Sequence, residues 1–224
     1  MDLLFKLLPI FSDLSSLLVF LVMIFFFSCW IKISTVLGIL RLGLGFTGLP
    51  SLSVVSALSV ALTLFVMSPS LAGLSNDLDL KLKSYGATSF DKLQPLQQSE
   101  VYQTLGNSWL KFLHHNTNQA DLERFAQLAV ELSGSPEASP ELISSWRVVA
   151  PAFIISEISK AFKIAFSIFL PFLIIDLVVA TILASVELGN LDSQIVSLPF
   201  KLLLFVTIDG WGLIAGNLVK SYIL

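Results

Sequence analysis

The sequence predicts an all-α protein in which long hydrophobic helical hairpins flank a polar helical insert. The 224-residue chain is 55% hydrophobic and only 13% charged, whereas soluble domains carry about 25% charged residues. Charge is also concentrated, because residues 77–147 hold 15 of the chain's 29 charged residues. We therefore expect three parts: a hydrophobic hairpin at 1–76, a soluble helical insert at 77–147 and hydrophobic broken-helix hairpins at 148–224.

The first part contains two predicted helices. Residues 14–31 are free of charge over 18 positions, close to the roughly 20 residues that cross a bilayer as a helix. The stretch LGLGFTGLPS at 42–51 contains three glycines and a proline and is predicted to be a loop or broken segment. A second helix is expected over 52–67, ended by Ser68-Pro69. Two basic residues between the predicted helices, Lys32 and Arg41, favour a hairpin.

The polar insert is predicted to hold amphipathic helices. Apolar residues recur near helical spacing over 96–115, and a further helix over 121–132 has Asp121 as an N-cap candidate. The stretch SGSPEASPE at 133–141 is a turn-rich linker. The insert carries six basic and nine acidic residues, which is typical of a mildly acidic, solvated surface. No dense basic run occurs, so nucleic acid is not expected as a partner.

The third part breaks the usual rules for membrane helices. Its apolar runs at 164–186 and 202–219 are interrupted by Asp176 and by Asp209-Gly210. A charge at the bilayer centre costs about 2.5–3.5 kcal/mol, so such residues normally face protein or water. A broken helix is tolerated there only when protein or a cavity covers it. We therefore expect this surface to face other subunits of an oligomer, with bends or close packing at Pro171, Pro199, Gly210, Gly212 and Gly216.

The sequence lacks patterns typical of enzymes. GLGFTG has no following Lys and so is not a nucleotide-binding phosphate loop, and no nucleophile elbow occurs in a credible context. The adjacent His114 and His115 cannot chelate together, and no cluster has metal-ligand spacing. Cys29 is expected to be a small buried hydrophobe. The N-terminus lacks a basic region and is expected to be retained. We predict no catalysis, no metal and no cofactor.

Several charges in apolar surroundings carry the functional hypotheses. Lys201 and Asp209 lie within LPFKLLLFVTIDGW, and Glu157, Lys160 and Lys163 lie in SEISKAFKIAF. They could form ion pairs between helices or subunits, or line a wet conduit. Taken without further information, the residues favour a small polytopic transporter or channel subunit, with Asp176 and Asp209 in an ion path.

A resemblance to a known family changes that balance. The stretches RVVAPAFIISEISKAFKIAFSIFLPFLIIDLVVATIL (147–183) and SLPFKLLLFVTIDGWGLIAGNL (197–218) closely resemble the FliP/SctR family, which includes YscR- and SpaP-like proteins. SCWIKISTVLGILRLGLG (28–45) and ALTLFVMSP (61–69) agree with the family's hairpin. These proteins are core export-apparatus subunits of bacterial flagella and type III secretion injectisomes. The insert matches only loosely.

The resemblance implies a structural, pore-forming subunit of an export gate through which unfolded substrates cross the inner membrane. It implies a homopentamer that joins SctS/FliQ-like and SctT/FliR-like subunits in a helical assembly. That assembly is expected largely on the periplasmic side of the inner membrane, within the basal body. SctU- and SctV-like export components and secreted proteins in transit are its other expected partners.

The resemblance also assigns roles to individual residues. Glu157 and Lys201 match a charged pair of the family and are predicted to meet across a subunit boundary, with Asp176 and Asp209 as further buried charges. Family members carry a run of methionines before the conserved L-P-F-K, and these form a gasket around the closed pore. The aligned residues here are Leu188, Gly189 and Asn190, so the constriction is expected at this segment without the adaptable methionine side chains.

Overall fold

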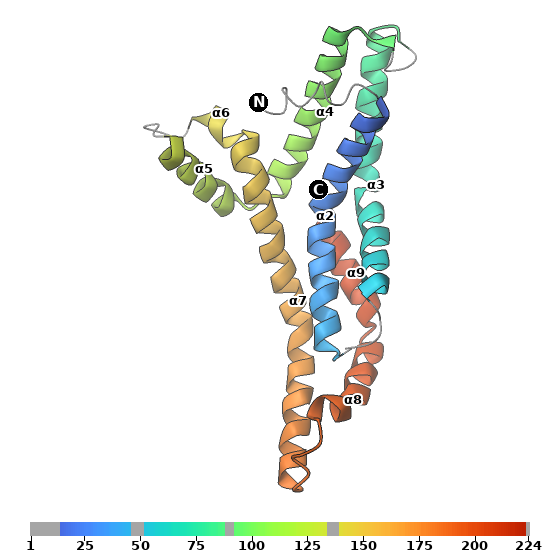
Figure 1. Cartoon of the computed structure of the whole chain (residues 1–224), viewed down its shortest axis with the longest axis vertical. Helices are drawn as coiled ribbons and strands as arrows, with labels where there is room; N and C mark the ends of the chain where they lie inside the picture. Colours follow the sequence, from blue (N-terminus) through green and yellow to red (C-terminus); the bar gives the residue numbers. More distant parts are fainter. Residues whose placement is uncertain (1–13, 46–51, 88–91, 134–138, 223–224) are drawn as a thin grey trace. The chain divides into compact units, whose positions relative to one another are not determined.

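The computed structural model describes residues 14–45, 52–87, 92–133 and 139–222 (Figure 1), with the side chains of these residues from Cys29 onward except Leu71 and Leu74. Every regular element within these ranges is helical, which confirms the all-α prediction. The helices are α2 (Leu14–Gly43), α3 (Leu52–Ser84), α4 (Pro95–Asn116), α5 (Gln119–Ser133), α6 (Pro140–Ile143), α7 (Trp146–Ser185), α8 (Ser193–Thr207) and α9 (Gly210–Lys220).

The chain forms two compact units, each of which is described by itself. Unit 1 comprises Met1–Cys29 with Met67–Glu157, and unit 2 comprises Trp30–Val66 with Ile158–Leu224. The three-part division by charge, at 76/77 and 147/148, is a different partition, and its first boundary lies inside α3. The division into a hydrophobic hairpin, a polar insert and a second hydrophobic part stays a prediction.

The predicted end of a helix at Ser68-Pro69 is wrong, because α3 continues through Pro69 to Ser84. An internal proline removes a backbone hydrogen bond and usually kinks or breaks a helix. Here the residues beyond it have a tertiary reason to stay helical. Leu78 and Leu82 pack against the buried cluster of Leu93, Val101 and Leu105. Packing of an apolar face supplies most helical stability in proteins and overrides the local signal.

The insert helices are confirmed, with one correction at a cap. The predicted helix at 96–115 lies within α4, whose start has Pro95 in its first turn and reciprocal bonds between Gln94 and Gln97. Such a capping box satisfies two backbone donors at once. Helix α5 begins at Gln119, so Asp121 lies in its first turn and is not the cap. Asn118 takes that place, since its Oδ1 accepts from the backbone N–H of Ala120 at 3.1 Å.

Other predictions fall partly outside the described residues. Of the loop expected at 42–51, residues 46–51 lie outside them, while α2 runs to Gly43. Of the linker expected at 133–141, residues 134–138 lie outside them, and α6 starts at Pro140 behind the cap of Ser139. The N-terminal residues 1–13 are outside as well. Cys29 is fully buried, as predicted, with its Sγ 3.0 Å from the sulfur of Met67.

Unit 1 is built around two apolar clusters. The end of α3 packs on the start of α4, where the Tyr85 hydroxyl donates to the Glu100 carboxylate. This hydrogen bond raises the pKa of Tyr85 above its usual value. In the second cluster α4, α5 and the start of α7 meet around Leu113, Leu122, Val149, Ala152 and Phe153. His114 and His115 lie on the exposed side of α4, as expected.

Unit 2 combines the second half of α2 and the first part of α3 with most of α7 and all of α8 and α9. Its core joins α2 residues such as Ile33 and Leu37 with Ala161 and Phe172 of α7 and Ile214 of α9. Helix α7 is 40 residues long and runs through Pro171, and α8 runs through Pro199, so neither proline ends its helix. The bends predicted at these two prolines stay predictions.

Two of the described helices are long and apolar enough to cross a membrane: the Leu52–Ser70 part of α3 and α7. Helices α8 and α9 would add a third span if the bent pair is taken as one. The two meet at 59°, which confirms the interruption predicted at Asp209-Gly210. These findings fit the expectation of a membrane-associated chain.

Candidate functional site

The main polar feature of unit 2 is an ion pair between α7 and α8. The Nζ of Lys201 lies 2.6 Å from Oδ2 of Asp176. The hydroxyl of Ser197 donates to Oδ1 of the same carboxylate. The Lys201 side chain is 2% exposed and that of Asp176 is 25% exposed. The ammonium is therefore almost completely removed from solvent, and a short charge-assisted bond compensates it.

Local sequence explains why α8 presents these groups to α7. Asp192 caps the start of α8, since its Oδ1 accepts from the backbone N–H of Gln194 at 2.9 Å. The buried residues of α8 are Ser197, Lys201 and Phe205. A spacing of four places such residues on one helix face. That face meets α7 with a polar layer at Asp176.

An aromatic layer lies one helical turn away from the polar layer. Phe172, four residues before Asp176 on α7, has its ring centroid 6.4 Å from that of Phe205. Phe205 in turn makes an edge-to-face contact with Trp211 of α9, at 5.1 Å between centroids. Aromatic pairs in such geometries add stability beyond their buried area. The ion pair and the rings together set the register of α8 against α7.

The end of α2 also approaches the ion pair. Gly45 has φ of +76°, and a side-chain carbon placed on it would lie 3.7 Å from Nζ of Lys201. Gly43, at the end of α2, packs so closely on Phe169 and Phe172 that a side-chain carbon would overlap the Phe169 ring. The glycine-rich stretch that the sequence indicated as a break therefore permits close backbone approach as well.

The break between α8 and α9 is centred on Asp209. This residue is in the left-handed region with φ of 48°, and its Oδ1 accepts from the backbone N–H of Gly212 at 3.3 Å. Asp is one of the few non-glycine residues that tolerate this conformation. A side-chain carbon on Gly210 would overlap the ring of Phe205, whereas one on Gly216 would meet nothing within 4 Å. Close packing at Gly216 stays a prediction about contacts with other chains.

Asp209 differs from the other predicted buried charges. It lies on the surface of this chain, next to exposed Ile208 and Trp211. Its burial was expected in an assembled oligomer and stays a prediction. Asp176 and Lys201, by contrast, already form their pair within one chain.

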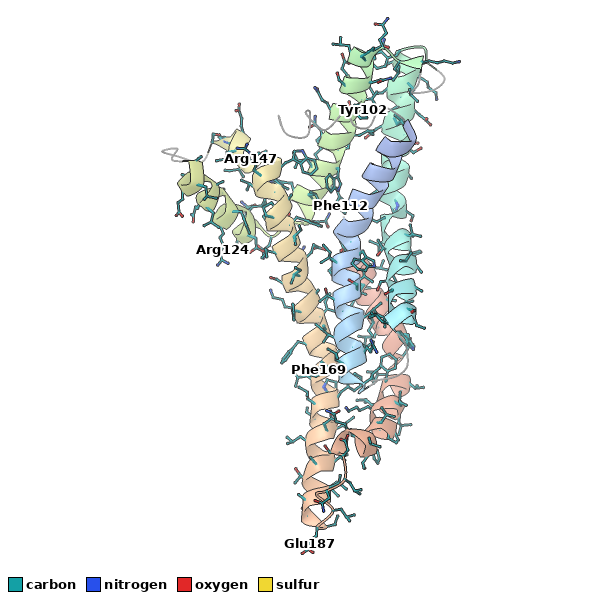
Figure 2. All side chains as sticks on the ribbon, viewed as in Figure 1. Tyr102, Phe112, Arg124, Arg147, Phe169 and Glu187 are labelled. Atoms are coloured by element: carbon teal, nitrogen blue, oxygen red, sulfur yellow. The ribbon has the colours of Figure 1, made fainter. Side chains whose placement is uncertain are left out.

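The predicted constriction lies in the turn between α7 and α8. Glu187 has φ of 62°, and Figure 2 shows it at the end of the α7–α8 hairpin. Leu188, Gly189 and Asn190 are all exposed, and so are Val186 and Leu191 on either side. The turn thus presents several apolar side chains. Its place at a pore stays a prediction.

Glu157 lies in unit 1 and is 1% exposed. The predicted cross-subunit pair of Glu157 with Lys201 stays a prediction, and within the chain the ammonium of Lys201 binds Asp176. Sequence reasoning placed Asp176 and Lys201 as separate charges and missed their contact. The signal was present in the spacing of Ser197 and Lys201, which marks a polar stripe on an otherwise apolar helix.

A second buried cation was also missed. Lys32 is fully buried, and its Nζ lies 3.3 Å from the centroid of the Tyr222 ring, just beyond the end of α9. A cation over an aromatic face is attracted to the ring's negative centre. The contact joins α2 to the end of α9. No sequence signal linked residues so far apart.

A broad apolar surface remains uncovered on α7 and α8. Phe162, Phe166 and Leu177 of α7 are more than half exposed, and so are Leu203 and Val206 of α8. Soluble monomers rarely expose large apolar patches. This face therefore requires lipid or other protein. Among the residues that the structure describes, no group of His, Cys, Asp and Glu could hold a metal ion.

Comparison with known proteins places the chain in a family. The model of the FliP family matches residues 13–218. The flagellar biosynthetic protein FliP of Agrobacterium fabrum is 36% identical over 190 residues, covering 83% of this chain and 71% of that protein. FliP of Caulobacter vibrioides is 37% identical over 194 residues, covering 86% and 68%. The hypersensitivity response secretion protein HrcR of Ralstonia nicotianae is 32% identical over 191 residues, covering 85% and 86%. The chain therefore belongs to the FliP family.

Proposed function

We propose that the chain is a structural, pore-forming subunit of a type III export apparatus. In this role it forms part of the gate through which unfolded proteins cross the bacterial inner membrane. Membership of the FliP family supports the proposal, because the relatives include both flagellar biosynthetic proteins and a hypersensitivity response secretion protein. The chain takes no catalytic part, and other components supply the energy.

The uncovered apolar face of α7 and α8 is the observation that carries the proposal. A lone helical hairpin in lipid has no need for a polar layer at Asp176 or a broken helix at Asp209, whereas both are tolerated beneath neighbouring protein. We propose that further copies of the chain, as a homopentamer, cover this face together with SctS/FliQ-like and SctT/FliR-like subunits. The assembly lies largely on the periplasmic side, next to SctU- and SctV-like components.

The α7–α8 turn supplies the constriction in this proposal. Gly189 and Asn190 cannot seal a pore as methionines do, because neither offers a long apolar side chain. Val186, Leu188 and Leu191 are each exposed by more than half at this turn. We propose that these three side chains from each copy form the seal. The ion pair at Lys201 holds the turn in place by fixing α8 against α7.

The alternative is a small transporter or channel subunit with Asp176 and Asp209 in an ion path. Exposed Asp209, next to the exposed Ile208 and Trp211, favours it. The contact of Asp176 with Lys201 weighs against it, since an ammonium 2.6 Å away already occupies the carboxylate that would bind the ion.

Native mass spectrometry of the detergent-extracted chain tests the two functions. The chain is expressed alone and then together with SctS/FliQ-like and SctT/FliR-like subunits from the same organism. We expect a homopentamer that gains the smaller subunits on co-expression. A monomer or dimer under both conditions would refute the proposal that the chain is a subunit of an export gate.

Cysteine cross-linking tests the constriction separately. In a Cys29→Ser background, Leu188→Cys should form disulfide-linked dimers within the assembly, because copies of the turn meet at the pore axis. Leu132→Cys, at an exposed apolar position of unit 1 outside the α7–α8 face, is the control. Equal cross-linking at both positions would contradict the placement of the turn at the pore axis, but it would not contradict the oligomer.

A further inference from the structure

A small apolar pocket lies in unit 2 where α2 ends and α3 begins. Its walls come from Leu37 and Leu40 of α2, from Leu44 just beyond the end of α2, from Val54, Val55 and Leu58 of α3, and from Trp211 of α9. The pocket is a small depression that is partly open to solvent. Its other lining residue is Arg41. A cation thus borders a surface that is otherwise entirely apolar.

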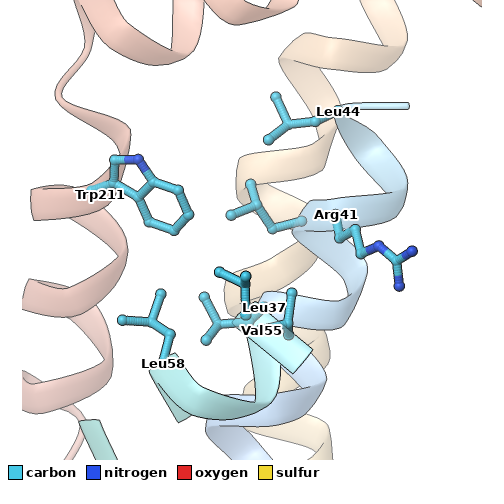
Figure 3. A pocket seen from close by; sticks show the side chains of 8 residues that line it. Leu37, Arg41, Leu44, Val55, Leu58 and Trp211 are labelled. Carbon is cyan, nitrogen blue, oxygen red and sulfur yellow. The ribbon is translucent and has the colours of Figure 1, made fainter. Parts of the chain in front are cut away.

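Arg41 is placed to bind an anion at the edge of this pocket. It lies in the last turn of α2, and its Nε is buried without a hydrogen-bond acceptor among the described residues. Figure 3 shows the guanidinium directed away from Trp211, so that the side chain forms a wall of the pocket while its charged end lies outside the apolar part. A buried donor without an acceptor is unfavourable, and a guanidinium matches the oxygens of a phosphate.

The pocket also borders the start of a helical stretch that is able to span a bilayer. Val54, Val55 and Leu58 belong to the first turns of the Leu52–Ser70 stretch, which is long and apolar enough to span a bilayer. Headgroups lie at the ends of such spans, and Trp and Arg are the residues that gather there. Trp211 is half exposed beside the pocket. The site thus has a charged end at Arg41 and an apolar part beside it, as a phospholipid has a charged headgroup joined to apolar chains.

We propose that this pocket binds an anionic phospholipid. The phosphate accepts hydrogen bonds from Arg41, and the first carbons of one acyl chain pack on Leu40, Val55 and Trp211. An open pocket with one cation and seven apolar residues suits a thin chain with a charged end. The proposal is independent of the export role, since it concerns a site within one chain.

Quenching of Trp211 by brominated lipid provides the test. The detergent-extracted full chain is titrated with phosphatidylglycerol that carries a dibrominated acyl chain, and in parallel with a diacylglycerol that carries the same chains but lacks the phosphate. Subtracting the signal of Trp211→Phe isolates this indole from the other tryptophans. We expect half-maximal quenching at about tenfold lower phosphatidylglycerol than diacylglycerol, the difference that one charge-assisted hydrogen bond produces.

Variants separate the site from general attraction to charge. Arg41→Gln should abolish the preference for phosphatidylglycerol, whereas Arg147→Gln, which removes an exposed arginine of unit 1, should keep it. Val54→Phe should weaken quenching by both lipids, because the larger side chain fills the pocket. If Arg41→Gln does not fold, Arg41→Lys retains the charge and should show a reduced preference, since it lacks the planar fork.

Three results would overturn the proposal. These are equal quenching by the two lipids in the parent chain, an unchanged preference in Arg41→Gln, or no quenching of Trp211 by either lipid. Inorganic phosphate provides the last comparison. If it displaces the brominated lipid at concentrations near those of the lipid itself, the site recognises free phosphate and the acyl chain contributes nothing.

Discussion

Replacing Asp176 with Asn should destabilise unit 2 more than any other single removal of a charge there. The change leaves the ammonium of Lys201 buried, with a side chain that is 2% exposed, and removes the carboxylate oxygen 2.6 Å away. Removing one partner of a buried pair typically costs about 3–5 kcal/mol. Because Asp176 itself is 25% exposed, solvent screens part of the interaction. We therefore expect the lower end of the range, about 3 kcal/mol.

The two halves of the pair should not cost the same. Lys201→Met removes the buried cation and keeps most of the volume, and the remaining carboxylate still reaches solvent and the hydroxyl of Ser197. We expect about 1 kcal/mol for this change. The double variant, Asp176→Asn with Lys201→Met, should lie within about 1 kcal/mol of the parent, because it leaves no buried charge without its partner. Asp209→Asn, at an exposed residue whose cap and backbone conformation Asn retains, is the control and should change stability by less than about 0.5 kcal/mol.

Thermal unfolding in detergent, followed by far-UV circular dichroism, measures these differences. For a chain of this size 1 kcal/mol shifts the midpoint by roughly 2–4 °C, so Asp176→Asn should lower it by about 6–12 °C. A drop for Lys201→Met as large as that for Asp176→Asn would refute the argument from burial. A double variant as unstable as the sum of the two single changes would show that the groups do not interact.

Two further predictions concern packing in the same unit. Gly210→Ala should lower stability by about 1–3 kcal/mol, because the added side-chain carbon overlaps the buried ring of Phe205. Gly216→Ala has open space around it and should be neutral or stabilising. Denaturation midpoints that rank the two variants the other way would contradict the geometry. Tyr222→Leu should lower the free energy of unfolding by about 2 kcal/mol, because it removes the ring beneath the buried cation of Lys32. Tyr222→Phe keeps the ring and should lose only a small part of this amount. Equal losses for Leu and Phe in the same thermal assay would assign the effect to the hydroxyl.

Much of the architecture was predictable from residue order because its causes are local. Uncharged runs predicted long helices, turn residues predicted the break at Asp209-Gly210, and apolar spacing predicted the helix at 96–115. The error at Pro69 shows the limit of such signals. A proline is a local stop, but Leu78 and Leu82 pack against residues of α4, and only the folded chain reveals that contact.

The candidate site divides in the same way. Sequence alone identified Asp176, Lys201 and Asp209 as charged residues within apolar stretches, because removing a charge from water is costly in any fold. It also established the family, since long, nearly ungapped stretches match. It could not pair the charges, as contacts across 25 or 190 positions depend on how helices cross. Only the tertiary structure decided that Lys201 meets Asp176, that Lys32 meets Tyr222 and that Asp209 stays at the surface. The physical reason is that the cost of burial belongs to a residue, whereas its compensation belongs to a neighbour that the fold supplies.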